Sequence, residues 1–150
     1  MARTFSAPPI TTRGNIGAVA MVYAFRLEAR FDPAHVEGGR RVFQGITGGT
    51  LTGPGLTGTV YPDSGGENGV IRADGTHDLS ARFMVRDARG EWLYFNHVGY
   101  ARPDGYYRLQ AYFDADAGGP YAWLNDAVMI GSATASGDGR DVTIDYHQAR

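Results

Sequence analysis

The chain has 150 residues, a formal net charge of -2 at pH 7 and no cysteine, and it contains 22 glycines and nine tyrosines. A chain of this length is expected to form one domain with its own core. The absence of cysteine excludes zinc–thiolate and iron–sulfur sites. All 14 Lys and Arg positions are arginine, which excludes a lysine Schiff base. The balanced charge argues against a nucleic-acid partner, and no apolar run is long enough for a transmembrane helix.

The start of the chain divides into a polar arm and a first strand. Residues 1–17 contain two prolines and predict a flexible N-terminal arm, followed by a β-domain at 18–150. The apolar stretch after the arm has no cleavage-site pattern, so we expect a strand rather than a signal peptide, and a cytoplasmic protein. Phe25, Leu27 and Ala29 then alternate with charged residues, which is the period of a strand.

Turn-forming residues divide the rest of the chain into short segments. Gly53-Pro54-Gly55 and Asp74-Gly75 are strong turn signals, and the second is a favoured hairpin turn. Nine strands are predicted in chain order, at 19–31, 42–52, 56–61, 67–73, 76–86, 91–101, 106–113, 127–135 and 141–147. A short helical turn is predicted near 121–126.

This arrangement of elements predicts an all-β fold. No segment has helical periodicity beyond one or two turns, so parallel strands joined by helices are not expected. The regular spacing of short strands instead favours a single antiparallel up-and-down β-barrel of about eight to ten strands. A barrel of that size has an interior with room for one small ligand.

Four groups of residues resemble one family when they are taken together. They are Ile46-Thr47-Gly48-Gly49-Thr50 with Gly53, Asp74-Gly75 with Asp78-Leu79-Ser80-Ala81-Arg82, Asn96-His97-Val98-Gly99, and Tyr121-Ala122-Trp123-Leu124-Asn125. Their order and spacing over about residues 22–147 are similar to those of the family called domain of unknown function 3237. The resemblance implies a calycin-like (lipocalin-like) barrel with a central cavity, often dimeric, so a homodimer is expected. It implies little about a reaction.

The sequence departs from the family pattern near the expected pocket. Glu67-Asn68 stands where the family often has an aromatic residue, and the segment 106–112 is unusually rich in tyrosine. The identity of a ligand therefore does not carry over from the resemblance.

Polar residues of the predicted strand at 76–86 are the first candidates for catalysis. Asp78, Ser80 and Arg82 lie on one face, because alternate side chains of a strand point the same way. If the lumen is the polar face, Asp78 is a candidate base and Arg82 a clamp for a developing anion. The alternative is a solvated outer face or a structural ion pair.

The following strand supplies further candidates. Trp92, Tyr94, Asn96 and Tyr100 share one face, which suits the wall of a ligand site or, alternatively, an aromatic core. The turn at 87–90 could bring Tyr94 or Asn96 near Arg82. On the opposite face, His97 is the candidate acid–base group, with a structural histidine as the alternative.

Three aromatic residues later in the chain complete the predicted pocket. Tyr112, Tyr121 and Trp123 are expected to bind substrate, and the last two would cap a barrel mouth or merely plug the core. The histidines lack metal-ligand spacing, no Gly-x-Ser-x-Gly elbow is present, and the glycines form no phosphate loop. No metal and no cofactor are therefore expected.

The combination predicts a cofactor-free enzyme that binds an aromatic or carbonyl-bearing small molecule inside the barrel. Asp78 or His97 would move a proton in an elimination, isomerisation or ring opening, of the lyase or isomerase type. Arg82, Tyr94 and Asn96 would stabilise the anion. A non-catalytic binding or carrier barrel is the main alternative, and a structural homodimer is a third.

Overall fold

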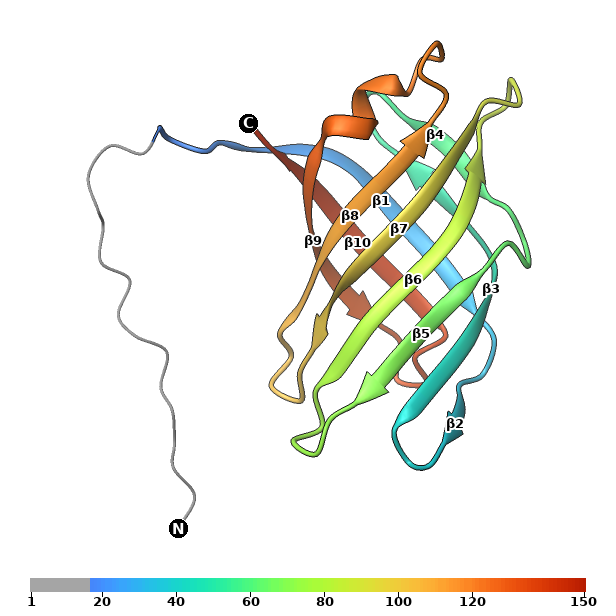
Figure 1. The fold of residues 1–150 in the computed structure, drawn as a ribbon, viewed down its shortest axis with the longest axis vertical. Helices are drawn as coiled ribbons and strands as arrows, with labels where there is room; N and C mark the ends of the chain where they lie inside the picture. Colours follow the sequence, from blue (N-terminus) through green and yellow to red (C-terminus); the bar gives the residue numbers. More distant parts are fainter. Residues whose placement is uncertain (1–16) are drawn as a thin grey trace.

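A computed structural model describes residues 17–150, so the flexible arm predicted at 1–17 lies almost wholly outside the described residues and stays a prediction. The described chain is built from short strands and one 3₁₀ turn (Figure 1). In chain order the elements are β1 (Met21–Phe31), β2 (His35–Glu37), β3 (Arg41–Thr52), β4 (Thr57–Val60), β5 (Gly66–Ile71), β6 (His77–Arg86), β7 (Trp92–Ala101), β8 (Tyr107–Ala115), η1 (Ala122–Asp126), β9 (Val128–Ala135) and β10 (Asp141–Ala149).

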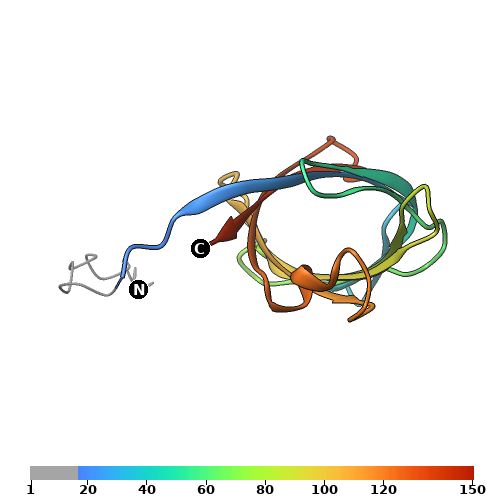
Figure 2. The ribbon, with the colours of Figure 1, turned by 90° about the horizontal axis from the view of Figure 1, so that it is seen from above.

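These strands form one closed antiparallel barrel with eight positions around its wall. From β6 to β10 each strand pairs with the next one in the chain, and β10 returns to pair with β1. The β1–β3 pairing closes the ring, which Figure 2 shows from above. Strands β4 and β5 together occupy one position in the wall, between β3 and β6. The short strand β2 pairs with β3 beyond the end of the β1–β3 pairing. The predicted all-β, up-and-down barrel is confirmed.

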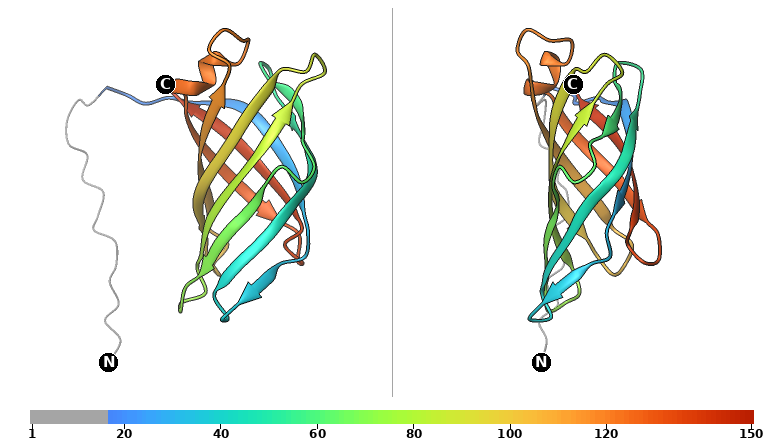
Figure 3. Two further views of the ribbon diagram at one scale, coloured as in Figure 1. Left: turned by 45° about the vertical axis from the view of Figure 1, so that its right-hand side comes forward. Right: turned by 90° about the vertical axis from the view of Figure 1, so that its right-hand side faces the viewer.

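The nine predicted strands are all present, with ends shifted by a few residues, and the helical turn near 121–126 is the 3₁₀ turn η1. Strand β2 was not predicted, because three residues after Asp32-Pro33 are too few to show the two-residue period of a strand. Within residues 17–150 no helix is long and apolar enough to cross a membrane. The two views of Figure 3 show the steep tilt of the strands around the barrel.

The lumen is apolar, and large aromatic side chains fill the half of it nearer to η1. Phe83 and Phe95 stack with ring centroids 4.8 Å apart, and Tyr146 packs against Phe95 at 5.6 Å. Phe25 adds a further ring 5.1 Å from Tyr146. The turn η1 lies at the upper end of the barrel in Figure 1, and its Leu124 is fully buried in the same hydrophobic core, so this end is filled and closed.

The apolar face of β6 points into the barrel, so the catalytic hypothesis for Asp78 and Arg82 is not supported and the outer-face alternative holds. Ala81, Phe83 and Val85 are buried in the lumen, whereas Arg82 is exposed and Asp78 is half-buried on the outer face. The prediction took the polar face of the strand for the lumen. In this barrel the apolar faces pack together inside and the polar faces meet the solvent, as in other antiparallel sheets.

Candidate functional site

A cavity of about 340 Å³ occupies the lower part of the lumen, below the aromatic cluster. Its wall is mostly aliphatic and comes from both sides of the barrel, including Ala29, Val42, Ile71, Leu79 and Ile144. The exposed residues on its edge come from the β2 segment and from the turn between β9 and β10. The cavity therefore opens at the end of the barrel opposite η1. Its volume lies in the lower range for small-molecule sites.

Two ionisable side chains meet on the wall of this cavity because of the strand register. Glu67 of β5 lies opposite Ala81 of β6, and Ala81 lies opposite His97 of β7. All three side chains point into the lumen. Since Ala81 has only a methyl group, the longer side chains on either side can approach each other above it.

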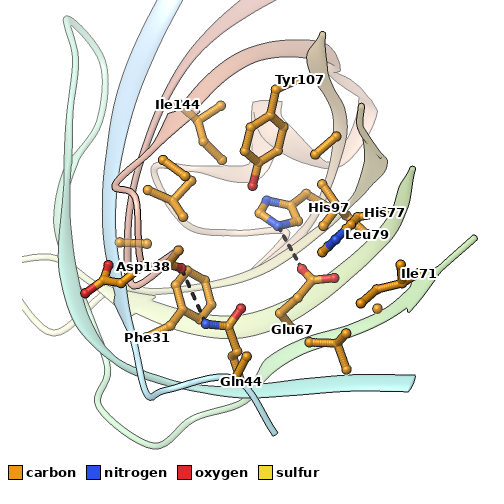
Figure 4. A pocket seen from close by; sticks show the side chains of 18 of the residues that line it. Phe31, Gln44, Glu67, Ile71, His77, Leu79, His97, Tyr107, Asp138 and Ile144 are labelled. Carbon is orange, nitrogen blue, oxygen red and sulfur yellow. Dashed lines mark hydrogen bonds and ion pairs between the residues drawn. The ribbon is translucent and has the colours of Figure 1, made fainter. Parts of the chain in front are cut away.

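The carboxylate of Glu67 is buried and fixed to the wall. The residue is 7% exposed, and its Oε1 accepts a 2.6 Å hydrogen bond from the backbone N–H of Ser80. The other oxygen, Oε2, lies 3.8 Å from Nε2 of His97, as the dashed line in Figure 4 marks. That separation is too long for a hydrogen bond, so both groups remain able to contact a bound molecule.

His97 is held in place by contacts on its other side. Its Nδ1 lies 3.0 Å from the Tyr146 hydroxyl, and the rings of Phe83 and Phe95 pack edge-on against the imidazole. Burial raises the pKa of Tyr146 well above its ordinary value, so this hydroxyl stays protonated and can donate a hydrogen bond to Nδ1. When Tyr146 donates this hydrogen bond, the N–H of a neutral imidazole is on Nε2, which faces Glu67.

Tyr107 and His77 add two more polar groups to the cavity wall. The Tyr107 hydroxyl points into the cavity toward His97 (Figure 4). Burial, and after it the negative charge of Glu67, raise the pKa of Tyr107, so its phenol remains a proton donor over the physiological range. His77 lies nearer the mouth and is half-buried.

This set of groups provides a base and several proton donors in an apolar setting. Glu67 can accept a proton, while Tyr107 and His97 can donate hydrogen bonds to an oxygen of a bound molecule. Such contacts are strong when water is excluded. Within residues 17–150, no cluster of three or more His, Asp or Glu side chains could hold a metal ion.

Among the residues predicted to be catalytic, His97 points into the cavity, whereas Asp78, Arg82, Tyr94 and Asn96 lie on the outer face. Asp78 accepts a 3.0 Å hydrogen bond from Arg72. The expected proximity of Arg82 and Asn96 is present, because the two residues are directly opposite in the β6–β7 pairing. They meet outside the barrel, so a reaction in the lumen cannot use them directly.

The residues predicted to bind substrate are also outside the cavity. Trp92, Tyr100 and Tyr112 lie on the outer face, and the guanidinium of Arg72 stacks over Tyr100 at 5.1 Å. Tyr121 is buried at the closed end of the barrel, whereas Trp123 is 41% exposed there. These two residues cap the end away from the mouth.

The outer face carries hollows of its own. Asp78 and Tyr100 line an open groove of about 550 Å³ that also includes Arg72, Tyr106 and Arg108. The groove lacks a buried polar cluster comparable to Glu67 and His97. The lumen is therefore the stronger candidate site.

Glu67, Tyr107 and Tyr146 were not predicted from the sequence as lumen residues. Two features of the sequence could have identified Glu67. It departs from the family pattern, and it lies on the same strand face as the apolar Ile71, four residues later. No such signal marked Tyr146, because its contact with His97 joins residues 49 positions apart.

Comparison with known proteins places the chain in a wider group of barrels. A conserved protein of unknown function from Rhodopseudomonas palustris has 27% identity and a TM-score of 0.80, over 91% of this chain and all of that one. A β-barrel-like protein from Acinetobacter baumannii has 19% identity and a TM-score of 0.78, over 92% of this chain and all of that one.

A third similar structure is described as an enzyme from Penicillium herquei, with 21% identity and a TM-score of 0.72, over 94% of this chain and all of that one. No curated protein matches the chain. The model of one family, described as protein of unknown function (DUF3237), matches residues 19–105, which is more than half of the chain. With its barrel fold and this match, the chain belongs to the DUF3237 family.

Proposed function

We propose that the protein is an enzyme that uses general acid–base chemistry on a small molecule bound in the lumen. The observation that carries this proposal is the buried pair of Glu67 and His97, 3.8 Å apart on the wall of an apolar cavity. A buried carboxylate without a guanidinium partner is costly to maintain, and such groups gather at functional sites. The similarity to a barrel described as an enzyme is consistent with the proposal but shows only the fold.

In the proposed reaction Glu67 is the base. Its Oε2 takes a proton from a carbon next to a carbonyl group, and the electron pair of the broken C–H bond forms an enolate. The Tyr107 hydroxyl and His97 Nε2–H donate hydrogen bonds to the enolate oxygen. If a second double bond is conjugated with the enolate, return of the proton from Glu67 to the far carbon of that double bond completes an isomerisation. If the adjacent carbon carries an oxygen leaving group, the enolate electrons form a C=C bond as the C–O bond breaks, and the leaving oxygen takes the proton back from Glu67. That step completes an elimination, or a ring opening where the leaving oxygen is part of a ring.

A carrier function is the second candidate, and the mostly aliphatic cavity wall favours it. A carrier would use the same cavity for binding without moving a proton. The expected homodimer and the cytoplasmic location are further proposals, independent of either function.

The proposed function is tested by proton exchange in deuterated water. Aromatic ketones, lactones and hydroxy-ketones are incubated with the protein, and NMR follows deuterium incorporation and product formation. We expect exchange or turnover of at least one compound, reduced by about a hundredfold or more in Glu67→Gln. Glu28→Gln, the same change on the exposed outer face of β1, is the matched control and retains the activity.

The same assay separates the alternatives. Asp78→Asn and Arg82→Ala test the sequence-based assignment, and we expect both outer-face variants to retain activity. Binding without exchange or turnover for any compound would contradict the enzyme and support the carrier. Full activity in Glu67→Gln would remove Glu67 from the mechanism.

A further inference from the structure

We infer that the lumen selects uncharged molecules with a carbonyl or hydroxyl oxygen and excludes carboxylates and phosphates. The inference concerns the ligand class of the site described above, so it rests on the proposed function for the choice of site. It depends on the distribution of charge between the lumen and the outer face.

The positive charges of the described chain are all on its surface. Every arginine between residues 17 and 150 is exposed, and none lines the cavity: Arg26, Arg30, Arg40, Arg41, Arg72, Arg82, Arg86, Arg89, Arg102, Arg108, Arg140 and Arg150. The sequence has no lysine. A bound anion would therefore find no permanent cation within the described part of the lumen.

The cavity itself carries negative charge. Glu67 is buried on its wall, and the exposed Asp138 lies at its mouth. The groups that could offset them are His97, which is 4% exposed, His77 near the mouth, and the exposed Arg140, whose charge helps to lower the pKa of Asp138. A positive charge on His97 would lie 3.8 Å from Glu67 and would be offset by that carboxylate, so it would not be available to a bound anion.

An anionic ligand would thus lose its hydration without gaining a partner. Removing a carboxylate from water is expensive unless a cation and hydrogen bonds replace the water. Its charge would also be repelled by Glu67 across a few ångströms of poorly screened space, which weakens binding by about a hundredfold at 6 Å and an effective dielectric constant near 20.

An uncharged oxygen avoids both penalties. The Tyr107 hydroxyl and His97 can donate to a carbonyl, while the aliphatic wall covers the rest of the molecule. A cationic ligand would be attracted by Glu67. Among residues 17–150, however, the wall provides no further buried carboxylate, and its phenyl and phenol rings are those of Phe31 and Tyr107 alone, so an uncharged ligand fits better.

The test compares three probes that share one ring system: 2-acetylnaphthalene, 2-naphthoate and protonated 2-naphthylmethylamine. Dissociation constants are measured by calorimetry at pH 7.5 for the wild type, Glu67→Gln and the Glu28→Gln control. We expect the wild type to bind the ketone at least a hundredfold more tightly than the carboxylate and more tightly than the amine. In Glu67→Gln the preference over the carboxylate narrows by about a hundredfold, because the repulsion from Glu67 is removed, and in Glu28→Gln it is unchanged.

Equal or tighter binding of the carboxylate or of the amine by the wild type would overturn the inference, as would failure of all three to bind at millimolar concentration. Circular dichroism checks that Glu67→Gln folds, but the comparison in the wild type decides the result without it. The outcome is separate from catalysis. If the protein binds the ketone selectively but exchanges no proton with deuterated water, only the enzyme proposal is contradicted. If it catalyses proton exchange but binds the carboxylate more tightly than the ketone, only this inference is contradicted.

Discussion

Small residues beside large ones determine the geometry of the candidate site. Ala81 leaves the space over which Glu67 and His97 approach. Gly131 likewise leaves the space that the Tyr146 ring occupies, because a methyl group added at Gly131 would lie 2.7 Å from Cε1 of that ring. The ring can therefore lie where its hydroxyl meets His97.

Tyr146→Phe tests the contact that orients His97. The substitution removes one hydroxyl from a fully buried ring and leaves Nδ1 of His97 without its 3.0 Å partner. We expect the free energy of unfolding to fall by about 1–3 kcal/mol, because a buried polar atom is left unsatisfied. Urea denaturation measures the change.

Tyr112→Phe is the matched control for this experiment. Its hydroxyl donates to Gln110 on the exposed outer face, so its removal is expected to change stability by less than about 0.5 kcal/mol. Equal losses in the two variants would mean that the Tyr146 hydroxyl does not support His97.

The sequence alone was sufficient to place His97 on the face with Leu93 and Phe95, because strand parity is a local property. It was not sufficient to identify that face as the lumen. A polar and an apolar face alternate in the same way whichever one points inward, and only the packing of all strands together decides between them.

At the scale of elements, one turn and the 3₁₀ segment hold the closed end of the barrel together. Asp87, after β6, accepts a 2.6 Å hydrogen bond from the Tyr121 hydroxyl, just before η1. Asp87 also accepts hydrogen bonds from the backbone N–H groups of Arg89 and Glu91. The turns themselves were predictable from Asp and Gly in sequence, whereas this contact over 34 positions was not.

The acid sensitivity of this closed end follows from Asp87. The Tyr121 hydrogen bond, with help from Arg89, holds the pKa of Asp87 well below its ordinary value of 3.8. Its stabilising contribution is therefore complete above pH 3.8 and is lost as the pH falls toward the lowered pKa. Asp87→Asn is expected to lower the melting temperature at pH 7, and the difference from the wild type is expected to shrink as the pH falls below 3.8.

Melting curves followed by circular dichroism between pH 7 and pH 2 measure this effect. Asp126→Asn, in the exposed part of η1, serves as the control and should follow the wild type. A constant gap between wild type and Asp87→Asn across the whole range would rule out the assigned ionisation.

At the scale of the whole molecule, the barrel is solid at one end and hollow at the other. The aromatic cluster of Phe25, Phe83, Phe95 and Tyr146 fills the end beneath η1, and the cavity occupies the other. Stability should therefore depend mainly on the filled end, while the hollow end can be devoted to binding.

Phe95→Ala tests this division. Phe95 is fully buried and touches four of the surrounding aromatic rings, so its loss is expected to cost about 3–5 kcal/mol of unfolding free energy. Phe43→Ala removes the same ring from a position that is 49% exposed, and should cost less than about 0.5 kcal/mol. Chemical denaturation of both variants measures the contrast, and similar losses would contradict it.

The closed end beneath η1 also has a consequence for kinetics. A molecule that enters among Ala34, Val36 and Gly137 has no route through the aromatic end, so its product leaves by the way it came. If the proposed reaction takes place in this chamber, product that has not yet left would occupy the same cavity of about 340 Å³ and would compete directly with the next substrate molecule for the same opening.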